Sequence, residues 1–107
     1  MNTVDIIEQC MKITSFGGQA KSLALQAIGM ARSNDLDGAD RTMAEAGEYL
    51  TRSHEAHTDL ISAEAGDNGI KIEVTLFMVH AADHLSAADT VYVLAEEIIH
   101  LYRKGRE

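Results

Sequence analysis

Apolar residues recur every three or four positions through most of this 107-residue sequence, which contains no proline. Such spacing places apolar side chains on one face of a helix, and proline is the residue that interrupts a helix most strongly. Two short clusters of turn-forming residues, SND at 33–35 and GDNG at 66–69, divide the pattern into three long segments. The sequence therefore predicts three long helices with short connections.

The middle segment has the most regular pattern. Its apolar positions form two rows, and its charged residues occupy the opposite face, as expected for a helix that packs along one side. The first row contains Leu36, Met43, Leu50 and His57, the second contains Ala39, Ala46 and Leu60, and the charged face contains Asp40, Arg41, Glu45, Glu48 and Arg52.

The first segment is interrupted by paired glycines in SFGG at 15–18. Adjacent glycines weaken the interior of a helix. We therefore expect a bend or a break near Gly17 and Gly18.

The third segment carries an apolar row interrupted by one acid, Asp83. We expect this row to face the core, where a single carboxylate is unfavourable unless it meets a cation, hydrogen-bond donors or a metal ion. Further apolar residues beside the row predict burial against other copies of the chain. The row contains Ile72, Leu76, Val79, Asp83, Ala87, Val91, Leu94, Ile98 and Leu101.

Composition agrees with a helical fold, because 46% of the residues are hydrophobic and only three tyrosines and two phenylalanines are aromatic. The hydrophobic residues are mainly aliphatic, with many alanines, which suits closely packed helices better than sheets. We predict an all-α, antiparallel three-helix bundle in which residues 1–107 form a single domain, assembling as a homo-oligomer.

Charge and cysteine content exclude several classes of protein. Nine basic and seventeen acidic residues give a net charge of −8, which would repel a nucleic-acid backbone. Cys10 is the single cysteine, which rules out an intrachain disulfide and fits the cytoplasm. No apolar run approaches the roughly 20 residues needed to cross a bilayer, so we expect no membrane insertion.

His80, Asp83 and His84 form the strongest candidate site. Their spacing places all three on neighbouring points of one helix. A neutral imidazole can act as a nucleophile toward a phosphoryl group, and a second imidazole one turn away can donate to a phosphate oxygen. If a symmetry axis ran along the apolar row, Asp83 residues from several chains would converge and require a hard cation such as Mg²⁺ or Ca²⁺.

A second interpretation uses the histidines for metal binding alone. His54 and His57 lie three apart on the middle helix, and together with His80 and His84 they could form a transition-metal site. The chain would then be a helical metal-binding or regulatory module without phosphoryl chemistry.

Three stretches resemble one known family along essentially the whole chain. They are ITSFGGQAKSLALQAIGMAR, DGADRTMAEAGEYLTRSHEAHTDLISAEA and VTLFMVHAADHLSAADTVYVLAEEIIHLYRKG. The last is the most specific, because the family motif reads approximately H-x-Q-D-H-L-M before a helix that ends in E-[FLI]-I-x-L-Y-x-[KR]. The family is the lactose/cellobiose-type enzyme IIA of the phosphoenolpyruvate-dependent sugar phosphotransferase system.

This resemblance implies a cytoplasmic phosphocarrier that takes a phosphoryl group from phospho-HPr and passes it to a IIB component, for uptake of a β-linked disaccharide of the cellobiose, lactose or chitobiose type. It implies that His80 carries the phosphoryl group and that His84 lines the site. It also implies a homotrimer of nine helices in which Asp83 from three subunits holds a metal ion, for which we expect Mg²⁺ or another hard divalent cation.

The sequence departs from the family pattern at three positions. Ala82 replaces the glutamine of the motif, Ser86 replaces its methionine, and His57 stands where the family commonly has glutamine. The histidine pair and Asp83 are unchanged. We expect these departures to affect the rate, the choice of IIB partner and the sugar more than the reaction itself.

Overall fold

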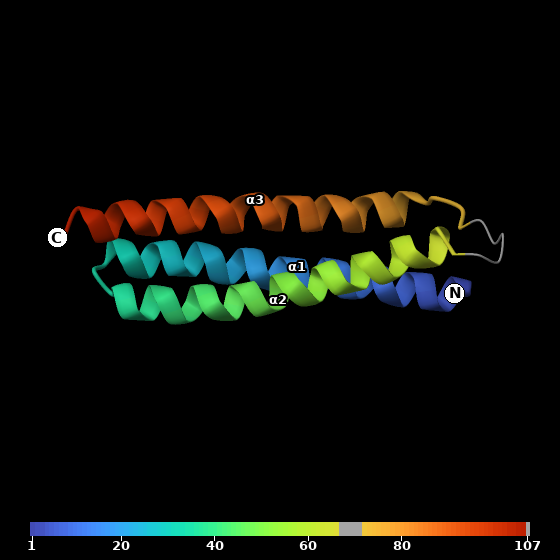
Figure 1. The fold of residues 1–107 in the computed structure, drawn as a ribbon, viewed down its shortest axis with the longest axis horizontal. Coiled ribbons are helices and arrows are strands. Elements are labelled where there is room, and N and C mark those ends of the chain that lie inside the picture. Colours follow the sequence, from blue (N-terminus) through green and yellow to red (C-terminus); the bar gives the residue numbers. More distant parts are fainter. Residues whose placement is uncertain (67–71, 107) are drawn as a thin grey trace.

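A computed structural model describes residues 1–66 and 72–106. They form the helices α1 (Thr3–Arg32), α2 (Leu36–Glu64) and α3 (Leu76–Lys104), with no strand in these two ranges. The chain reverses direction between α1 and α2 and again before α3, so that α1 and α3 run in parallel (Figure 1). The molecule is a rod of 57 × 19 × 19 Å. The predicted all-α three-helix bundle is confirmed.

Each helix begins with a polar side chain that accepts a hydrogen bond from an otherwise free backbone N–H. At α1, Asn2 accepts from the Asp5 amide at 2.9 Å while the Asp5 carboxylate accepts from the Asn2 amide at 3.2 Å. The other two N-caps are Asp35 and Thr75.

The first predicted connection is confirmed, because α1 ends at Arg32 and α2 begins at Leu36. Between them Asn34 adopts a positive φ of 68°, a conformation that asparagine tolerates well. The second predicted connection lies mostly outside the described residues. The structure starts α3 at Leu76 after the Thr75 cap, so Ile72 precedes the helix, although its side chain is buried.

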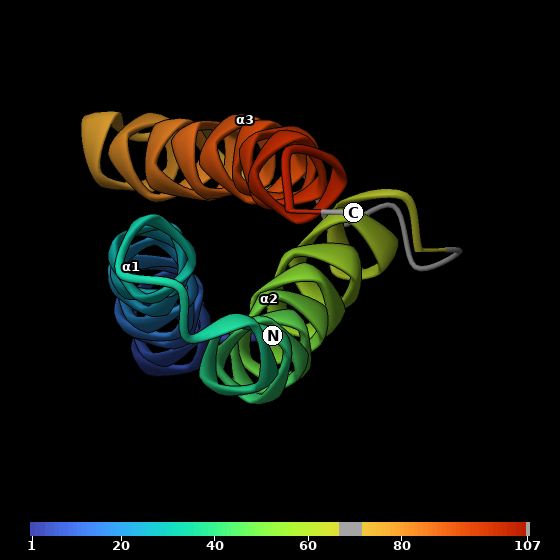
Figure 2. The same ribbon diagram turned by 90° about the vertical axis from the view of Figure 1, so that its left-hand side faces the viewer.

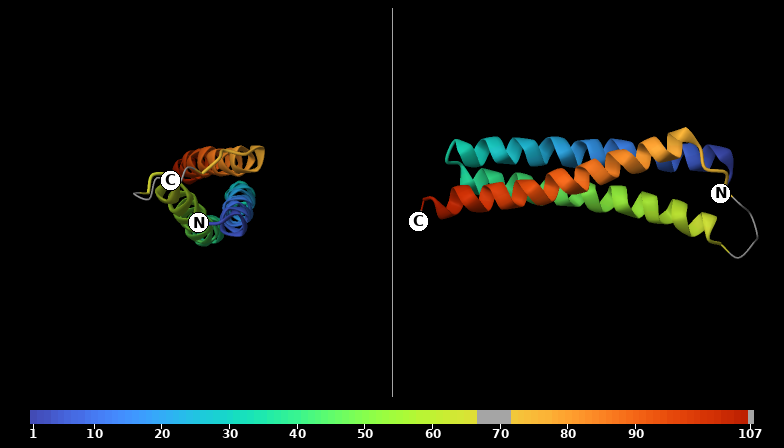
Figure 3. Two further views of the ribbon diagram at one scale, coloured as in Figure 1. Left: turned by 90° about the vertical axis from the view of Figure 1, so that its right-hand side faces the viewer. Right: turned by 90° about the horizontal axis from the view of Figure 1, so that it is seen from above.

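The helix α1 packs against both other helices, whereas α2 and α3 contact each other less. Seen end-on, α1 and α2 lie side by side and α3 lies across them (Figure 2). Seen from above, α3 crosses the other two obliquely (Figure 3). Within the described ranges, no helix is long and apolar enough to cross a membrane.

The interior consists largely of alanine, and larger side chains such as Ile13, Leu60 and Leu85 fill the remaining space. Small side chains allow helix axes to approach closely. The fully buried alanines are Ala20, Ala24, Ala27, Ala31, Ala39, Ala46, Ala81, Ala88 and Ala95.

Of the bend or break predicted near Gly17 and Gly18, the break is wrong, because α1 continues through both residues. A Cβ atom built on Gly17 would lie 3.3 Å from Ser53 Oγ of α2 and 3.7 Å from the backbone oxygen of His84 in α3. The glycine therefore allows all three helices to meet at one level, and contacts on both sides offset its weak helix propensity.

The apolar row of α3 faces away from its own bundle, which contradicts the prediction that it faces the core. Leu76 is 83% exposed, Leu94 is 54% exposed and Leu101 is 66% exposed. Asp83 in the same row is also exposed. The reason is that α3 uses its other apolar face for the bundle, where alanines permit closer packing: Met78, Ala81, Leu85, Ala88, Ala95 and Ile99.

Candidate functional site

His80 and His84 contact each other on the surface of α3. Residues four apart on a helix are neighbours, and here the two Nε2 atoms lie 3.1 Å apart. The rings meet edge to face, with centroids 4.5 Å apart and planes at 80°. His80 is exposed and His84 is half-buried, so His80 is the more accessible of the two imidazoles.

The contact between the two Nε2 atoms fixes their protonation relative to each other. A hydrogen bond needs a donor N–H on one ring and a free lone pair on the other. Two imidazolium rings would offer only donors to each other, so this geometry needs at least one neutral ring. The pair can therefore supply one nucleophilic nitrogen and, beside it, one N–H donor for an anion.

Asp83 does not join the histidine pair. It precedes His84 by one residue and therefore projects about 100° away around the helix. There it lies on the outward-facing apolar row, where its side chain is exposed. The three predicted site residues thus occupy neighbouring but different sides of α3.

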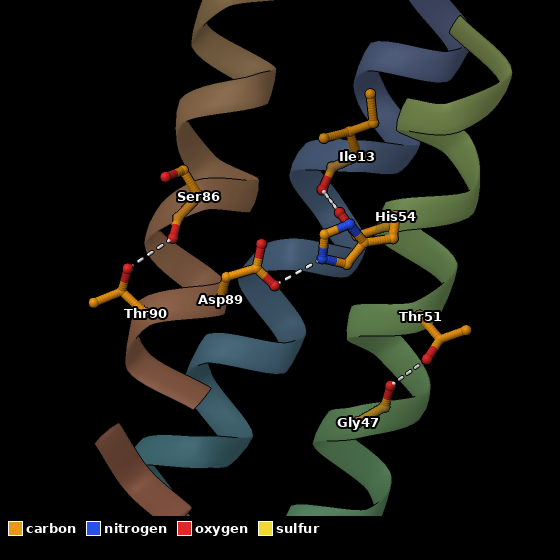
Figure 4. A network of polar contacts seen from close by, with 8 residues as sticks. Ile13, Gly47, Thr51, His54, Ser86, Asp89 and Thr90 are labelled. Carbon is orange, nitrogen blue, oxygen red and sulfur yellow. Dashed lines mark hydrogen bonds and ion pairs between the residues drawn. The ribbon is translucent and has the colours of Figure 1, made fainter. Parts of the chain in front are cut away.

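The other predicted histidines belong to α2, and one of them contacts α3. His54 Nε2 is 2.7 Å from Asp89 Oδ1, and this pair links the two helices that contact each other least (Figure 4). His57 is half-buried one turn further along α2. In residues 1–66 and 72–106 of one chain, no three or more His, Cys, Asp or Glu side chains gather as a metal site would require.

Two polar residues near the histidines were not singled out from the sequence. Asp89 contacts a residue 35 positions earlier, and local spacing gives no signal for such a partner. Ser53 is fully buried and donates to the backbone oxygen of Ile13 at 2.7 Å, which fixes α2 to α1 at the same level. A serine at a core position of the α2 pattern was the available signal.

Comparison with known proteins identifies the family. The model of the lactose/cellobiose-specific IIA subunit of the phosphotransferase system matches residues 8–103. The chain belongs to this IIA family. A relative in this family, the lichenan-specific phosphotransferase enzyme IIA component of Bacillus subtilis, is 46% identical over 96 residues, which is 90% of this chain and 86% of the relative.

Solved IIA structures share the fold. The cellobiose-specific enzyme IIA from Bacillus anthracis superimposes with a TM-score of 0.88 at 35% identity, covering 99% of this chain and 94% of that one. The IIA(chitobiose) protein in a complex with HPr, from the Escherichia coli phosphotransferase system, gives 0.76 at 32% identity, covering 95% and 97%. The present chain is accordingly a phosphotransferase-system IIA component.

Among the hydrogen bonds of the described residues, none joins the histidine pair to the three residues that depart from the IIA motif. Ala82 is half-buried and Ser86 is exposed on α3, while His57 belongs to α2. The bond that involves Ser86 is local, since its backbone oxygen accepts from Thr90 Oγ1 at 3.1 Å (Figure 4). The contact between His80 and His84 therefore depends on none of these three side chains.

Proposed function

We propose that this IIA chain is a phosphocarrier that accepts a phosphoryl group from phospho-HPr on His80 and passes it to its IIB partner. The observation that carries this proposal is the pair of imidazoles with Nε2 atoms 3.1 Å apart, one exposed and one half-buried. The solved complex of a related IIA protein with HPr supports HPr as the donor.

The transfer exchanges one bond to phosphorus for another. The N–H of His84 first turns from the His80 lone pair to a phosphoryl oxygen, to which it donates a hydrogen bond. The freed lone pair of neutral His80 Nε2 attacks phosphorus, and the bond from phosphorus to the donor group of HPr breaks as that group takes back its electron pair. On transfer to IIB, a nucleophile of IIB attacks phosphorus, and the bond to His80 Nε2 breaks as the imidazole takes back its electron pair.

The outward-facing surface of α3 supports association between copies of the chain. Val79, Leu94 and Leu101 expose apolar side chains along the length of the helix, and on α1 Met11 and Leu25 do the same. Apolar rows of this extent on a protein surface favour burial against other chains. We propose three chains arranged around an axis along the α3 row, giving nine helices.

Asp83 fits a metal site only in such an assembly. One exposed carboxylate per chain is a poor ligand set, but three of them around an axis would give hard oxygen donors suited to Mg²⁺ or a similar divalent cation. The cation would offset the repulsion between the carboxylates. It would lie between the subunits and take no part in the transfer.

The physiological setting follows the relatives. Those named in the comparison serve lichenan, cellobiose and chitobiose, so we propose a β-linked disaccharide as the sugar of this system. A cytoplasmic location fits the exchange with HPr. The net charge of −8 favours basic or neutral docking surfaces on both partners.

Incubation with phosphoenolpyruvate, enzyme I and HPr tests the function. We expect one acid-labile phosphoryl group per chain, lost in His80→Ala and retained in His100→Ala, which removes another exposed histidine of α3. Labelling of His80→Ala to the wild-type level would exclude His80 as the acceptor.

The alternative of a histidine metal module is not favoured by the geometry of one chain. His54 bonds to Asp89 while His80 and His84 bond to each other, so the four histidines divide into separate contacts. Elemental analysis separates the two functions, because the alternative requires zinc or iron bound in proportion to chains rather than one hard cation per three chains.

A further inference from the structure

A phosphoryl group on His80 would need a counter-charge. It carries about two negative charges near neutral pH, on a chain whose formal charge is already −8. The turn of α3 from His80 to His84 contains an acid and no lysine or arginine. A cation for the phosphoryl group must therefore come from another helix or another chain.

The first helix carries a lysine one turn from its contact with the backbone of His84. Lys21 follows Gly17 by one turn and therefore lies on the same side of α1. That side meets α3, because a Cβ atom on Gly17 would lie 3.7 Å from the backbone oxygen of His84. Since α1 and α3 run in parallel (Figure 1), Lys21 lies about 6 Å beyond this contact, on the side away from His80. The side chain of Lys21 is half-buried, as expected at the edge of the contact between α1 and α3.

The stem of Lys21 leans back toward this contact. Side chains on a helix lean toward its N-terminus, so the stem is directed from its own turn toward the level of Gly17 and His84. A Cβ atom on the neighbouring Gly18 would meet nothing within 4 Å, so the surface beside the stem is open. The flexible stem can thus bring its ammonium group toward the imidazoles while the charge stays in water.

The charge of Lys21 is also available. Elsewhere in the described part of the chain, Lys12 pairs with Glu8 and Arg103 pairs with Asp40. Lys21 takes part in none of the ion pairs found among these residues. Its ammonium group is therefore free to attract an anion that the histidine pair carries.

We propose that Lys21 binds the phosphoryl group carried by His80 and stabilises the phosphorylated form. This role rests on the proposed phosphocarrier function.

The test compares Lys21→Met with Lys12→Met in the full chain. Both variants remove one positive charge from α1, but Lys12 pairs with Glu8 instead of facing α3. The first readout is the equilibrium of phosphoryl exchange with phospho-HPr at low salt. The second is the pKa of the phosphoryl group on His80, followed by its phosphorus NMR shift.

For Lys21→Met we expect the exchange equilibrium to shift about fivefold toward phospho-HPr, the size of one partly screened charge contact. The pKa of the phosphoryl group should rise, because a nearby cation favours its more ionised form. Lys12→Met should stay within about twofold of wild type, and Lys21→Arg should restore most of the loss.

Equal behaviour of Lys21→Met and Lys12→Met in both readouts would overturn the role of Lys21 while leaving the phosphocarrier intact. Unchanged thermal unfolding of the variants confirms that a shift does not come from misfolding. If the wild-type chain itself gained no acid-labile phosphate, the phosphocarrier function and the role of Lys21 would fail together.

Discussion

Gly17 and Gly18 are adjacent in the chain but have opposite surroundings. A Cβ atom on Gly17 would lie 3.3 Å from Ser53 Oγ, which is fully buried and held by its hydrogen bond to the Ile13 carbonyl. A Cβ atom on Gly18 would meet open space. Alanine substitutions at the two positions therefore measure different effects: helix propensity at Gly18 and close packing at Gly17.

Gly18→Ala should raise the free energy of unfolding by roughly 0.5–1 kcal/mol, because alanine favours the helix and restricts the unfolded chain. Gly17→Ala should lower it by about 1 kcal/mol or more, because Ser53 must move from its bond. Urea unfolding at neutral pH measures both. Stabilisation by both substitutions would show that the three helices do not meet closely at Gly17.

Cys10 gives a second prediction at this scale. Its side chain is fully buried among the helices, and burial raises the pKa of its thiol. The native protein should therefore react with a thiol reagent at pH 8 far more slowly than the same chain in denaturant, where more thiolate is present and accessible. Equal rates in the two states would contradict a buried Cys10.

Local spacing predicted the contact between His80 and His84, although Asp83, grouped with them, projects to a different side of α3. His80 and His84 are four apart on one helix, so their contact follows from helical geometry alone. The partner of His54 could not be predicted in this way, because Asp89 belongs to a different helix and depends on how α2 and α3 are set against each other.

At the scale of elements, polar contacts link the two helices that pack least. His54 meets Asp89 at 2.7 Å near the middle of the rod, and Asp40 meets Arg103 at 2.6 Å nearer one end. All four side chains are between 40% and 57% exposed. These links orient α3 relative to α2, while apolar contacts with α1 supply more of the stability.

A double-mutant cycle on His54 and Asp89 should give a coupling energy below about 1 kcal/mol, because water screens an exposed pair. The two single alanine variants and the double variant are compared by thermal unfolding at pH 6. A coupling of several kcal/mol would mean that the pair is much less accessible to water than its exposure indicates.

The three helices, and the connection between α1 and α2, could be predicted from the sequence. Apolar spacing and turn-forming residues determine them locally. The continuity of α1 could not be predicted, because it depends on contacts that Gly17 makes with α2 and α3. The apolar row predicted for the third helix began at Ile72, which precedes the start of α3 at Leu76. Ile72 is apolar and buried without being helical, and apolar spacing does not distinguish the two.

At the scale of the whole molecule, α3 has two apolar faces and its bundle covers one. The other face includes Val79, which is 53% exposed, and Leu94, which is 54% exposed, with Asp83 between apolar neighbours. Periodicity cannot tell which face meets the chain's own core. The prediction that this row faces the core is therefore wrong, whereas the association of several copies stays a prediction.

Asp83→Leu should keep or increase the mass of the assembly in sedimentation, because an apolar side chain removes the repulsion between buried carboxylates. It should also abolish any hard cation bound by the assembly. As a matched change in the same row, Leu94→Glu should reduce the assembly to smaller species. Monomers of Asp83→Leu would contradict an acid cluster on the axis.

The length of α3 places its last turn far from the histidine pair. At about 1.5 Å per residue, Lys104 lies about 36 Å along the helix from His80. A fluorophore attached in that last turn would stand clear of a protein docked at the imidazoles. Its depolarisation could then follow the arrival and departure of each exchange partner in real time without obstructing either one.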